Sequence, residues 1–290
     1  MLDFIVNPTA GGKKGKKIMK ILHVLTKRLE KENVDYAIHI TRELKSSREK
    51  TEELIKNGAT DIIAVGGDGT LHEVINGFSN FEKVNLGIIP CGTGNDFARA
   101  INLPKKPIKA LEVILNNKPQ YTDYMQMPTV RGLNVIGTGI DVDVLKKYNA
   151  LKKKNKFGYT KCLIKTLFDF EYTDFVVEID GEKNSFRSFI AGVCNGYRFG
   201  GGIPICPIAS ANDGELDFIA VKEMPRIKII GAFLKLKAGK ILKLKQSIYK
   251  KIKKIKITSD KPFTVNVDGE LYEDIPFEVK IISNTLKIYR

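Results

Sequence analysis

Two patterns of hydrophobic residues divide the chain. Up to about position 122, short apolar runs that predict strands alternate with stretches whose apolar residues recur every three or four positions, as in helices. The expected strands are 4–6, 36–41, 62–65 and 86–89, and the expected helices lie within 18–29, 46–57, 71–78, 97–101 and 111–115. Because most of these strands are apolar on both faces, this part predicts a parallel sheet covered by helices on both sides.

Beyond that point, alternating runs separated by turns replace the strand–helix pattern. Short strands are expected at 175–179, 186–193, 216–221, 252–257, 263–267, 277–282 and 286–289. Strands of this length and spacing predict an antiparallel β-sandwich or barrel. We therefore expect a doubly wound α/β domain over 1–122 and a larger β-sandwich domain over 123–283. The pattern leaves open whether the last strand, near 284–290, rejoins the first domain.

Composition excludes several classes of protein and suggests a compartment. The 290 residues are 43% hydrophobic and 28% charged, close to the average for globular proteins and unlike a disordered or fibrous chain. The N-terminus does not resemble a signal peptide, and no apolar stretch is long enough to span a bilayer. Four cysteines without metal-binding spacing and three scattered histidines favour a cytoplasmic protein with reduced thiols and no zinc site.

A glycine-rich loop after the expected strand 62–65 is the most informative segment. Gly66-Gly67-Asp68-Gly69-Thr70 connects that strand to an amphipathic helix that begins with Leu71 and His72. Glycines let the backbone approach an anion closely, and the free N–H groups at a helix start point toward it. Asp68 would repel a bare phosphate, so we expect it to act through a cation, a ribose or an orienting hydrogen bond.

Two further loops have the same construction. Pro90-Cys91-Gly92-Thr93-Gly94-Asn95-Asp96 links strand 86–89 to a helix that Asn95 or Asp96 can cap, and Asn7-Pro8-Thr9-Ala10-Gly11-Gly12 follows strand 4–6. Loops at the carboxyl ends of parallel strands line one crevice in open α/β sheets, where nucleotides bind. Three such loops together predict the binding of ATP-type phosphates.

These three segments, extended by Phe97-Ala98-Arg99, resemble the diacylglycerol kinase catalytic family, and within it the soluble bacterial diacylglycerol kinase-like lipid kinases. The more distant NAD kinases share the Gly-Gly-Asp-Gly loop but are not expected to carry the segment from Gly92 to Arg99. The resemblance spans essentially the whole chain and implies an NAD kinase-like first domain, ATP and Mg²⁺ as cofactors, and a lipid substrate. It implies that the nucleotide is bound by Asn7, Pro8, Thr9, Ala10, Gly11, Thr41, Gly66, Gly67, Asp68, Gly69, Thr70, Leu71, His72, Thr93, Asn95 and Asp96.

Two acidic turns in the second half are candidates for the remaining chemistry. The segment 210–215 offers oxygen ligands of the kind that Mg²⁺ prefers, although an ordinary turn explains the same string. The family's magnesium position maps to Asp213, with main-chain oxygens implied at Ser210 and Glu215. At Asp268-Gly269-Glu270, otherwise a plain hairpin turn, the resemblance implies the carboxylate that takes the proton from the lipid hydroxyl. Asp268 and Glu270 both remain candidates for this base, and Glu270 is preferred.

The expected activity is transfer of the γ-phosphate of ATP, bound on the loops in a cleft between the two domains, to the hydroxyl of a diacylglycerol-like lipid. The product would be a phosphatidic-acid-type phospholipid. Another lipid or a sphingoid base is an alternative substrate that the sequence does not separate from diacylglycerol, and a small-molecule kinase of the NAD kinase type is a further alternative. A non-catalytic binder of anionic surfaces is a weaker hypothesis, because it leaves the three glycine loops unexplained.

The net charge indicates a further partner. The formal charge is +15, and two stretches without any acidic residue, 146–165 with eight lysines and 226–256 with 12 basic residues, together exceed that value. The rest of the chain is therefore net acidic. Apolar residues accompany the lysines in both stretches, which favours a surface that docks transiently on the inner, anionic leaflet of the membrane. The alternative for each stretch is an ordinary helix with a solvated basic face and its apolar stripe in the core. We expect no nucleic-acid partner, because no nucleic-acid-binding motif is present, and a homodimer is compatible with the sequence.

Overall fold

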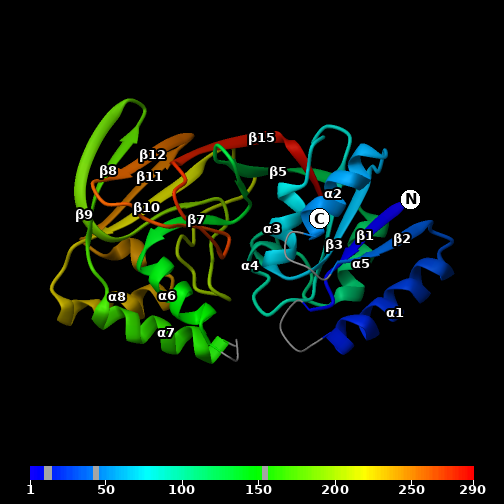
Figure 1. Cartoon of the computed structure of the whole chain (residues 1–290), viewed down its shortest axis with the longest axis horizontal. Coiled ribbons are helices and arrows are strands. Elements are labelled where there is room, and N and C mark those ends of the chain that lie inside the picture. The colour runs from blue at the N-terminus through cyan, green and yellow to red at the C-terminus, as the bar shows by residue number, and fades with distance from the viewer. Residues whose placement is uncertain (10–14, 42–45, 152–155) are drawn as a thin grey trace. The chain divides into compact units, whose positions relative to one another are not determined.

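A computed structural model describes residues 1–9, 15–41, 46–151 and 156–290 (Figure 1). The chain divides into two compact units: unit 1 is Met1–Asp123 with Ser283–Arg290, and unit 2 is Tyr124–Ile282. Two strands, β5 (Pro119–Gln126) and β15 (Phe277–Tyr289), contribute residues to both units.

Unit 1 is a parallel sheet between two layers of helices. Strand β1 (Leu2–Val6) pairs in parallel with β2 (Tyr36–Ile40) and β3 (Asp61–Gly66), and β3 pairs in parallel with β4 (Asn85–Pro90). The helices are α1 (Gly15–Lys31), α2 (Ser46–Lys56), α3 (Asp68–Asn76), α4 (Asp96–Ala100) and α5 (Pro107–Asn116). Helices α1 and α5 cover one face of the sheet, and α2 and α3 lie against the other. This is the doubly wound arrangement that the apolar pattern predicts.

The central strands explain this layering. Ile63 and Val65 of β3 pack with α1 and α5, whereas Ile62 and Ala64 point to the opposite face, and all four are almost inaccessible to solvent. The final strand also belongs to this sheet: Lys287 and Ile288 of β15 pair in parallel with β4. A strand added beside β4 buries Ile288 and lets the Tyr289 hydroxyl donate a hydrogen bond to Asp61.

Unit 2 is an antiparallel β-sandwich with helices on one side, and its sandwich confirms the predicted fold class. Its other strands are β6 (Arg131–Gly132), β7 (Val135–Gly139), β8 (Thr173–Ile179), β9 (Glu182–Cys194), β10 (Leu216–Lys222), β11 (Ser247–Ile252), β12 (Lys254–Ser259), β13 (Val265–Val267) and β14 (Glu270–Tyr272). The long strand β9 pairs with β8 through its first half and lies between β7 and β10 through its second half. It therefore joins two sheets, whose inner faces enclose a core that includes Phe175, Phe218 and Phe277.

Three helices of unit 2 were not predicted. They are α6 (Ile140–Asn149), α7 (Lys156–Asp169) and α8 (Arg226–Lys237), and they bury a second apolar cluster against the outer face of β9 and β10. A short 3₁₀ helix, η1 (Ile241–Lys243), follows α8. Figure 1 shows α6, α7 and α8 along one side of unit 2. Lysines interrupt the apolar residues of these helices, which is why their sequences indicate a charged surface more clearly than a helix.

Two strand predictions were wrong. The expected strand 252–257 is divided between β11 and β12, because the buried residues Ile252 and Ile255 are three positions apart and cannot share one face of a continuous strand. Conversely, the strands expected at 277–282 and 286–289 are one strand, β15. Asn284 adopts φ +57° within it, and this left-handed residue accommodates the change in alternation between Val279 and Leu286.

Candidate active site

Two glycine loops lie against each other at the carboxyl ends of β3 and β4. Cys91 and Gly92 donate their backbone N–H groups to the carbonyl oxygen of Gly66, at 2.7 and 3.1 Å. A Cβ atom on Gly92 would lie 2.5 Å from the Cα of Gly67, so only glycine permits this backbone approach. The two loops predicted to bind phosphate therefore form one continuous backbone surface.

Asp68 holds the two loops together. Its Oδ2 and Oδ1 atoms accept hydrogen bonds from the backbone N–H groups of Asn95 and Asp96, each at 2.8 Å. These N–H groups open helix α4, and the Asn95 side chain does not cap it. Asn95 is the N-cap residue of α4, as expected, but its side chain makes no capping hydrogen bond, and the Asp68 carboxylate at the start of α3 supplies the acceptor instead. Of the three roles considered for Asp68, the geometry supports the orienting hydrogen bond.

The Asn95 side chain instead stabilises its own loop. Asn95 adopts φ +53°, and its amide accepts a hydrogen bond from the Gly92 N–H at 2.9 Å and donates one to the Gly92 carbonyl at 3.1 Å. The loop between Gly92 and Asp96 is thus fixed at its start by the Asn95 amide and at its end by the Asp68 carboxylate. Thr93, at the tip of this loop, is exposed.

The third loop begins beside β3. The Asn7 N–H donates to the Val65 carbonyl at 3.3 Å, and the Asn7 side chain accepts hydrogen bonds from the N–H and hydroxyl of Thr9 at 3.0 and 2.8 Å. Pro8 is half-buried between them. Ala10 and Gly11, which the resemblance also assigns to the nucleotide site, lie outside the described residues.

Four other predicted nucleotide contacts are buried: Thr41, Thr70, Leu71 and His72. The Thr41 hydroxyl is within hydrogen-bond distance of the Ser47 hydroxyl, at 2.9 Å. Burial, together with the nearby Arg48 charge, lowers the pKa of His72 to about 4, so its ring is neutral at physiological pH. These side chains support the loops from behind and expose little surface to a ligand. Gly67, Asp68 and Gly69 are half-buried at the loop itself.

A basic pocket beside the second glycine loop was missed by the sequence reasoning. A cavity of about 240 Å³ is lined by Gly92 and Asn95 of the loop and by Lys17, Arg99 and Lys105. The Nε atom of Arg99 is buried without a hydrogen-bond partner in the described part of the chain. Such a nitrogen can still donate a hydrogen bond to an anion that enters the pocket. Arg99 was visible in the motif, but nothing in the spacing of Lys17 and Lys105 connects them with it.

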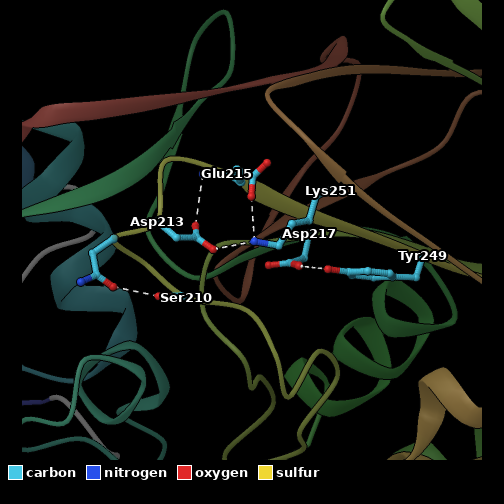
Figure 2. A network of polar contacts seen from close by, with 7 residues as sticks. Ser210, Asp213, Glu215, Asp217, Tyr249 and Lys251 are labelled. Atoms are coloured by element: carbon cyan, nitrogen blue, oxygen red, sulfur yellow. Dashed lines mark hydrogen bonds and ion pairs between the residues drawn. The ribbon is translucent and has the colours of Figure 1, made fainter.

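The acidic turn at 210–215 surrounds a cation (Figure 2). The Lys251 ammonium nitrogen lies 2.9 Å from Asp213 Oδ2 and 2.7 Å from Glu215 Oε2. Hydrogen bonds to Glu215 and then Asp213 raise the pKa of Lys251, so the ammonium stays charged. The Ser210 hydroxyl is within hydrogen-bond distance of the Asn212 side chain, not of the carboxylates. In the described residues, no three acidic, histidine or cysteine side chains form a metal cluster, so the turn offers two carboxylates.

A buried carboxylate lies on the same face of these strands. Asp217 of β10 is paired in register with Lys251 of β11, and its Oδ1 accepts a 2.7 Å hydrogen bond from the Tyr249 hydroxyl (Figure 2). Its Oδ2 is buried without a hydrogen-bond partner in the residues that the structure describes. Burial raises the pKa of Asp217. The turn therefore concentrates negative charge around one ammonium group, which is an arrangement that fits a bound cation.

The two carboxylates of the Asp268-Gly269-Glu270 turn lie in different environments. Asp268 Oδ2 accepts a 2.6 Å hydrogen bond from Leu133 N–H, and its Oδ1 accepts 2.9 Å bonds from Asn134 and Val135. Burial raises the pKa of Asp268 to about 6, and these three hydrogen bonds limit the rise. Asp268 thus fastens the turn to the start of β7, whereas Glu270 is exposed on β14. Of the two carboxylates, Glu270 is the one that is exposed.

A second buried acid, missed by the sequence reasoning, is linked to that turn. Asp141 Oδ2 accepts a 3.0 Å hydrogen bond from the side-chain NH₂ of Asn266. The side-chain oxygen of Asn266 in turn accepts a hydrogen bond from Gly269 N–H at 2.8 Å. Asp141 Oδ1 is buried and has no hydrogen-bond partner in the described part of the chain. Burial raises the pKa of Asp141 to about 6. Its signal in the sequence was a carboxyl between Ile140 and Val142.

Asp141 is also the one charged residue among those that line an apolar cavity in unit 2. The cavity is about 40 Å³ and lies among α6, α7, α8 and the outer face of β9 and β10, where Leu167, Phe189 and Phe233 contribute to its wall. Its volume is close to the ~30 Å³ that one water occupies in the liquid. The cavity therefore marks a loosely packed place with a carboxyl at its edge.

Comparison with known proteins now identifies the family. Residues 2–127 match the model of the diacylglycerol kinase catalytic domain, and residues 134–290 match the YegS C-terminal NAD kinase beta sandwich-like domain. The chain belongs to the diacylglycerol kinase and YegS-like lipid kinase family. The predicted family is thereby confirmed. Membership in a kinase family implies the use of ATP.

Individual members of this family align over most of the chain. A diacylglycerol kinase from Staphylococcus carnosus is 27% identical over 290 residues, which cover 98% of this chain and 93% of the relative. A protein of Alcanivorax borkumensis named "Probable lipid kinase YegS-like" is 30% identical over 281 residues, covering 88% and 87%.

Solved structures support the fold of this lipid kinase family member. The crystal structure of a diacylglycerol kinase from Bacillus anthracis matches with a TM-score of 0.71 at 22% identity, covering 99% of this chain and 96% of that chain. An NAD kinase from Archaeoglobus fulgidus in complex with ATP matches with a TM-score of 0.54 at 17% identity, covering 100% and 94%. At these identities the likeness concerns the fold alone. In the described residues, no helix is both long enough and apolar enough to cross a membrane.

Proposed function

We propose that this family member transfers the γ-phosphate of ATP to the hydroxyl of a diacylglycerol-like lipid. The observation that carries the proposal is the junction at Asp68, where one carboxylate holds two glycine loops side by side as a single backbone surface. Such a surface at the carboxyl ends of parallel strands suits the phosphates of a nucleotide. Within a lipid kinase family, that nucleotide is the phosphate donor.

The basic pocket beside the second loop supports this part of the proposal. Lys17, Arg99 and Lys105 line it without any acidic residue, so its charge is complementary to a polyphosphate. The buried Arg99 Nε atom would gain the acceptor that it lacks in the protein alone. The loops would let the nucleotide approach the backbone closely, and the pocket would add positive charge.

The lipid side of the reaction would use unit 2. The apolar cavity near α7 and α8 supplies a hydrophobic surface for an acyl chain once its walls separate, because its present volume holds little more than a methylene group. Asp141 at its edge is hydrogen-bonded through Asn266 to the turn that carries Glu270. Glu270 would accept the proton of the lipid hydroxyl while that oxygen forms its bond to the γ-phosphorus, and the bond from the γ-phosphorus to the bridging oxygen would break to release ADP.

The side-chain carboxylates of Asp213 and Glu215 would hold Mg²⁺, whereas the resemblance implies main-chain oxygens at Ser210 and Glu215 beside Asp213. Asp213 and Glu215 already converge on one cation, so the donor set fits the oxygen preference of this ion. When bound, Mg²⁺ neutralises phosphate charge. The residues themselves fix where the cation lies, because Glu215 N–H donates to Asp213 Oδ1 at 3.1 Å and closes the turn.

The deciding experiment is a substrate panel. The purified protein would be given radiolabelled ATP with diacylglycerol, monoacylglycerol, undecaprenol, a sphingoid base or phosphatidylglycerol in mixed micelles, and separately with NAD in buffer. We expect label in a phosphatidic-acid-type product from diacylglycerol. Label transferred only to NAD would make the protein a small-molecule kinase, and label transferred only to another lipid would correct the substrate class.

The lysine in the acidic turn gives a separate prediction. Lys251→Met removes the ammonium and leaves Asp213 and Glu215 without their counter-cation, so we expect the dissociation constant for Mn²⁺, used as a probe for Mg²⁺, to fall about tenfold. Electron paramagnetic resonance of free Mn²⁺ measures this without any activity assay. Lys250→Met is the matched control on the same strand, because Lys250 pairs with Asp180 at 3.7 Å and not with the turn. Equal affinity in both variants would contradict the metal assignment.

Asp141 predicts a dependence of stability on pH. Its pKa is raised from 3.8 to about 6, so between these values the folded protein binds more protons than the unfolded chain. The contribution of the protonated carboxyl to the free energy of unfolding is therefore complete below about pH 4 and is lost as the pH rises through about 6. Asp141→Asn should raise the free energy of unfolding by about 2 kcal/mol at pH 7.5 and leave it nearly unchanged at pH 4.

Urea unfolding at the two pH values checks this prediction, with Asp143→Asn as the control. Asp143 is half-buried, and its raised pKa is partly offset by Lys146 and Lys147, so we expect a smaller effect. A gain in stability accompanied by a loss of lipid phosphorylation would mark Asp141 as a residue kept for function. A loss of stability at pH 7.5 would show that its ionisation is not costly.

A further inference from the structure

Helix α8 has two apolar faces, and the outer one is uncovered. On the inner face Ile229 and Ala232 are buried, and the half-buried Phe233 and Leu236 pack into the cluster beneath α7 and α8. Three large aliphatic side chains lie on the other side, and their exposed fractions are 85% for Ile227, 50% for Ile230 and 62% for Leu234. Spacings of three and four residues place them in one stripe along the helix.

The neighbouring helix α7 carries a fourth exposed aliphatic residue. Helices α7 and α8 contact each other, and Ile164 of α7 is 46% exposed between the exposed lysines Lys161 and Lys165. Single exposed aliphatic residues are ordinary, but a stripe of three on one helix with a fourth on its neighbour is not. A surface of this kind is retained when something covers it.

Positive charge accompanies the stripe on the same helix. Arg226, Lys228, Lys235 and Lys237 belong to α8, and no acidic residue occurs from 226 to 256. Lys228 and Lys235 have no carboxylate partner in the part of the chain that the structure describes. Lysines later in the same basic stretch differ: Lys250, Lys251 and Lys256 each lie within 4 Å of an acidic side chain. Lys228 and Lys235, on the same helix as the stripe, are therefore available for an anionic partner.

We propose that α8, with the adjoining surface of α7, docks on an anionic lipid leaflet. The lysines and Arg226 would contact the headgroups, and Ile227, Ile230 and Leu234 would enter the acyl boundary, as in other interfacial helices. The proposal names the surface at which the proposed lipid kinase reaches its substrate, and so it rests on that function. The inner face of the same helix lines the apolar cavity, which places the cavity wall directly behind the docking surface.

Charge decides between a membrane and a second copy of the chain. In a symmetric dimer the same patch meets itself, so two α8 helices would bring their cations together without any acid to offset them. An anionic leaflet satisfies both features at once, since it offers negative headgroups above an apolar layer. A second copy or an acidic protein partner is an outcome of the test below.

The experiment measures binding of the full-length protein to vesicles of phosphatidylcholine with and without 30% phosphatidylglycerol by sedimentation, where the vesicle composition is our choice of probe. We expect binding to the anionic vesicles that falls at least about tenfold as salt is raised from low to physiological levels. The double variant I227S/L234S should lower this binding at least about tenfold, and K228Q/K235Q should lower it by a similar factor. All four positions are exposed, so the fold should be retained.

The matched control and a second assay make the result decisive. V24S/K27Q replaces one exposed aliphatic and one exposed basic residue of α1 and should leave vesicle binding unchanged. Activity toward diacylglycerol dispersed in non-ionic detergent should be the same for the α8 variants and the unmodified protein. Vesicle binding that is unchanged in I227S/L234S, or a loss of vesicle binding that is equally large in V24S/K27Q, would overturn the proposal.

Two further outcomes separate this proposal from the proposed function. Vesicle binding that depends on α8, without phosphorylation of any lipid, would refute the kinase substrate but leave the docking surface standing. Phosphorylation of lipid in vesicles that is unaffected by the α8 variants would refute the docking surface alone. A dimer in solution that I227S/L234S dissociates would assign the stripe to a second copy and also refute it.

Discussion

Asp68→Asn is expected to lower kcat/KM for ATP-dependent lipid phosphorylation at least about 100-fold, a loss of the size that small displacements of catalytic groups produce. The Asp68 carboxylate accepts from the N–H groups of Asn95 and Asp96 with separate oxygens. An amide offers one oxygen and directs its NH₂ group at the second donor. The second glycine loop would then move away from the first, and the shared surface for phosphate would open.

Steady-state kinetics with varied ATP, together with binding of a fluorescent ATP analogue, would measure this loss. Asp61→Asn is the matched control, because Asp61 lies at the end of β3 that is farther from the glycine loop and is hydrogen-bonded to Asn85 and Tyr289. It should alter thermal stability but leave nucleotide binding intact. Activity of Asp68→Asn close to that of the unmodified protein would show that the loop junction does not serve the nucleotide.

The loops could be predicted because their physics is local. A strand followed by glycines and an amphipathic helix specifies both the backbone approach and the donors, and the close contact of Gly67 with Gly92 is a consequence of that composition. What the sequence could not show is that Asp68 caps a helix 28 residues further along. Such a bond depends on how β3 and β4 lie side by side, which no local pattern contains.

The helices of unit 2 show a different limit. Helix α8 is apolar on its buried side at Ile229 and on its exposed side at Ile227, so its residues do not follow the one-sided pattern from which helices are predicted. The exposed apolar residues that obscured the helical pattern are also the observation on which the docking proposal rests. By contrast, the division between β11 and β12 could have been predicted, since Ile252 and Ile255 are out of phase for one strand.

Asp141 and Lys251 were missed for a third reason. Their interest comes from partners that are distant in sequence: Asn266 for Asp141, and the turn at 213–215 for Lys251. Alone, Asp141 is an acid in an apolar helix and Lys251 is one lysine in a basic stretch. Chemistry that depends on tertiary contacts requires the structure, whereas chemistry carried by a contiguous loop can be found in the sequence.

Glu270→Gln is expected to lower kcat by a factor of about 10² to 10⁴ with little change in KM, because general-base catalysis contributes an acceleration of that size. The substitution removes the proton acceptor and keeps the shape of the side chain. Glu273→Gln is the matched control on the same hairpin, since Glu273 is 72% exposed and pairs only loosely with Lys146, at 3.8 Å. Kinetics in detergent micelles with saturating ATP would measure the effect.

Asp268→Asn separates the two carboxylates of the turn. Asp268 accepts three backbone hydrogen bonds, and bonds of this kind to a charged group contribute about 1.5–3 kcal/mol each, so its loss should lower both activity and thermal stability. Glu270→Gln should lower activity alone. If Asp268→Asn were inactive at unchanged stability while Glu270→Gln remained active, the base would be Asp268. In that case the reactive group would be the Asp268 carboxylate, which would approach the substrate from the buried side of the turn. Its oxygens already accept three backbone hydrogen bonds.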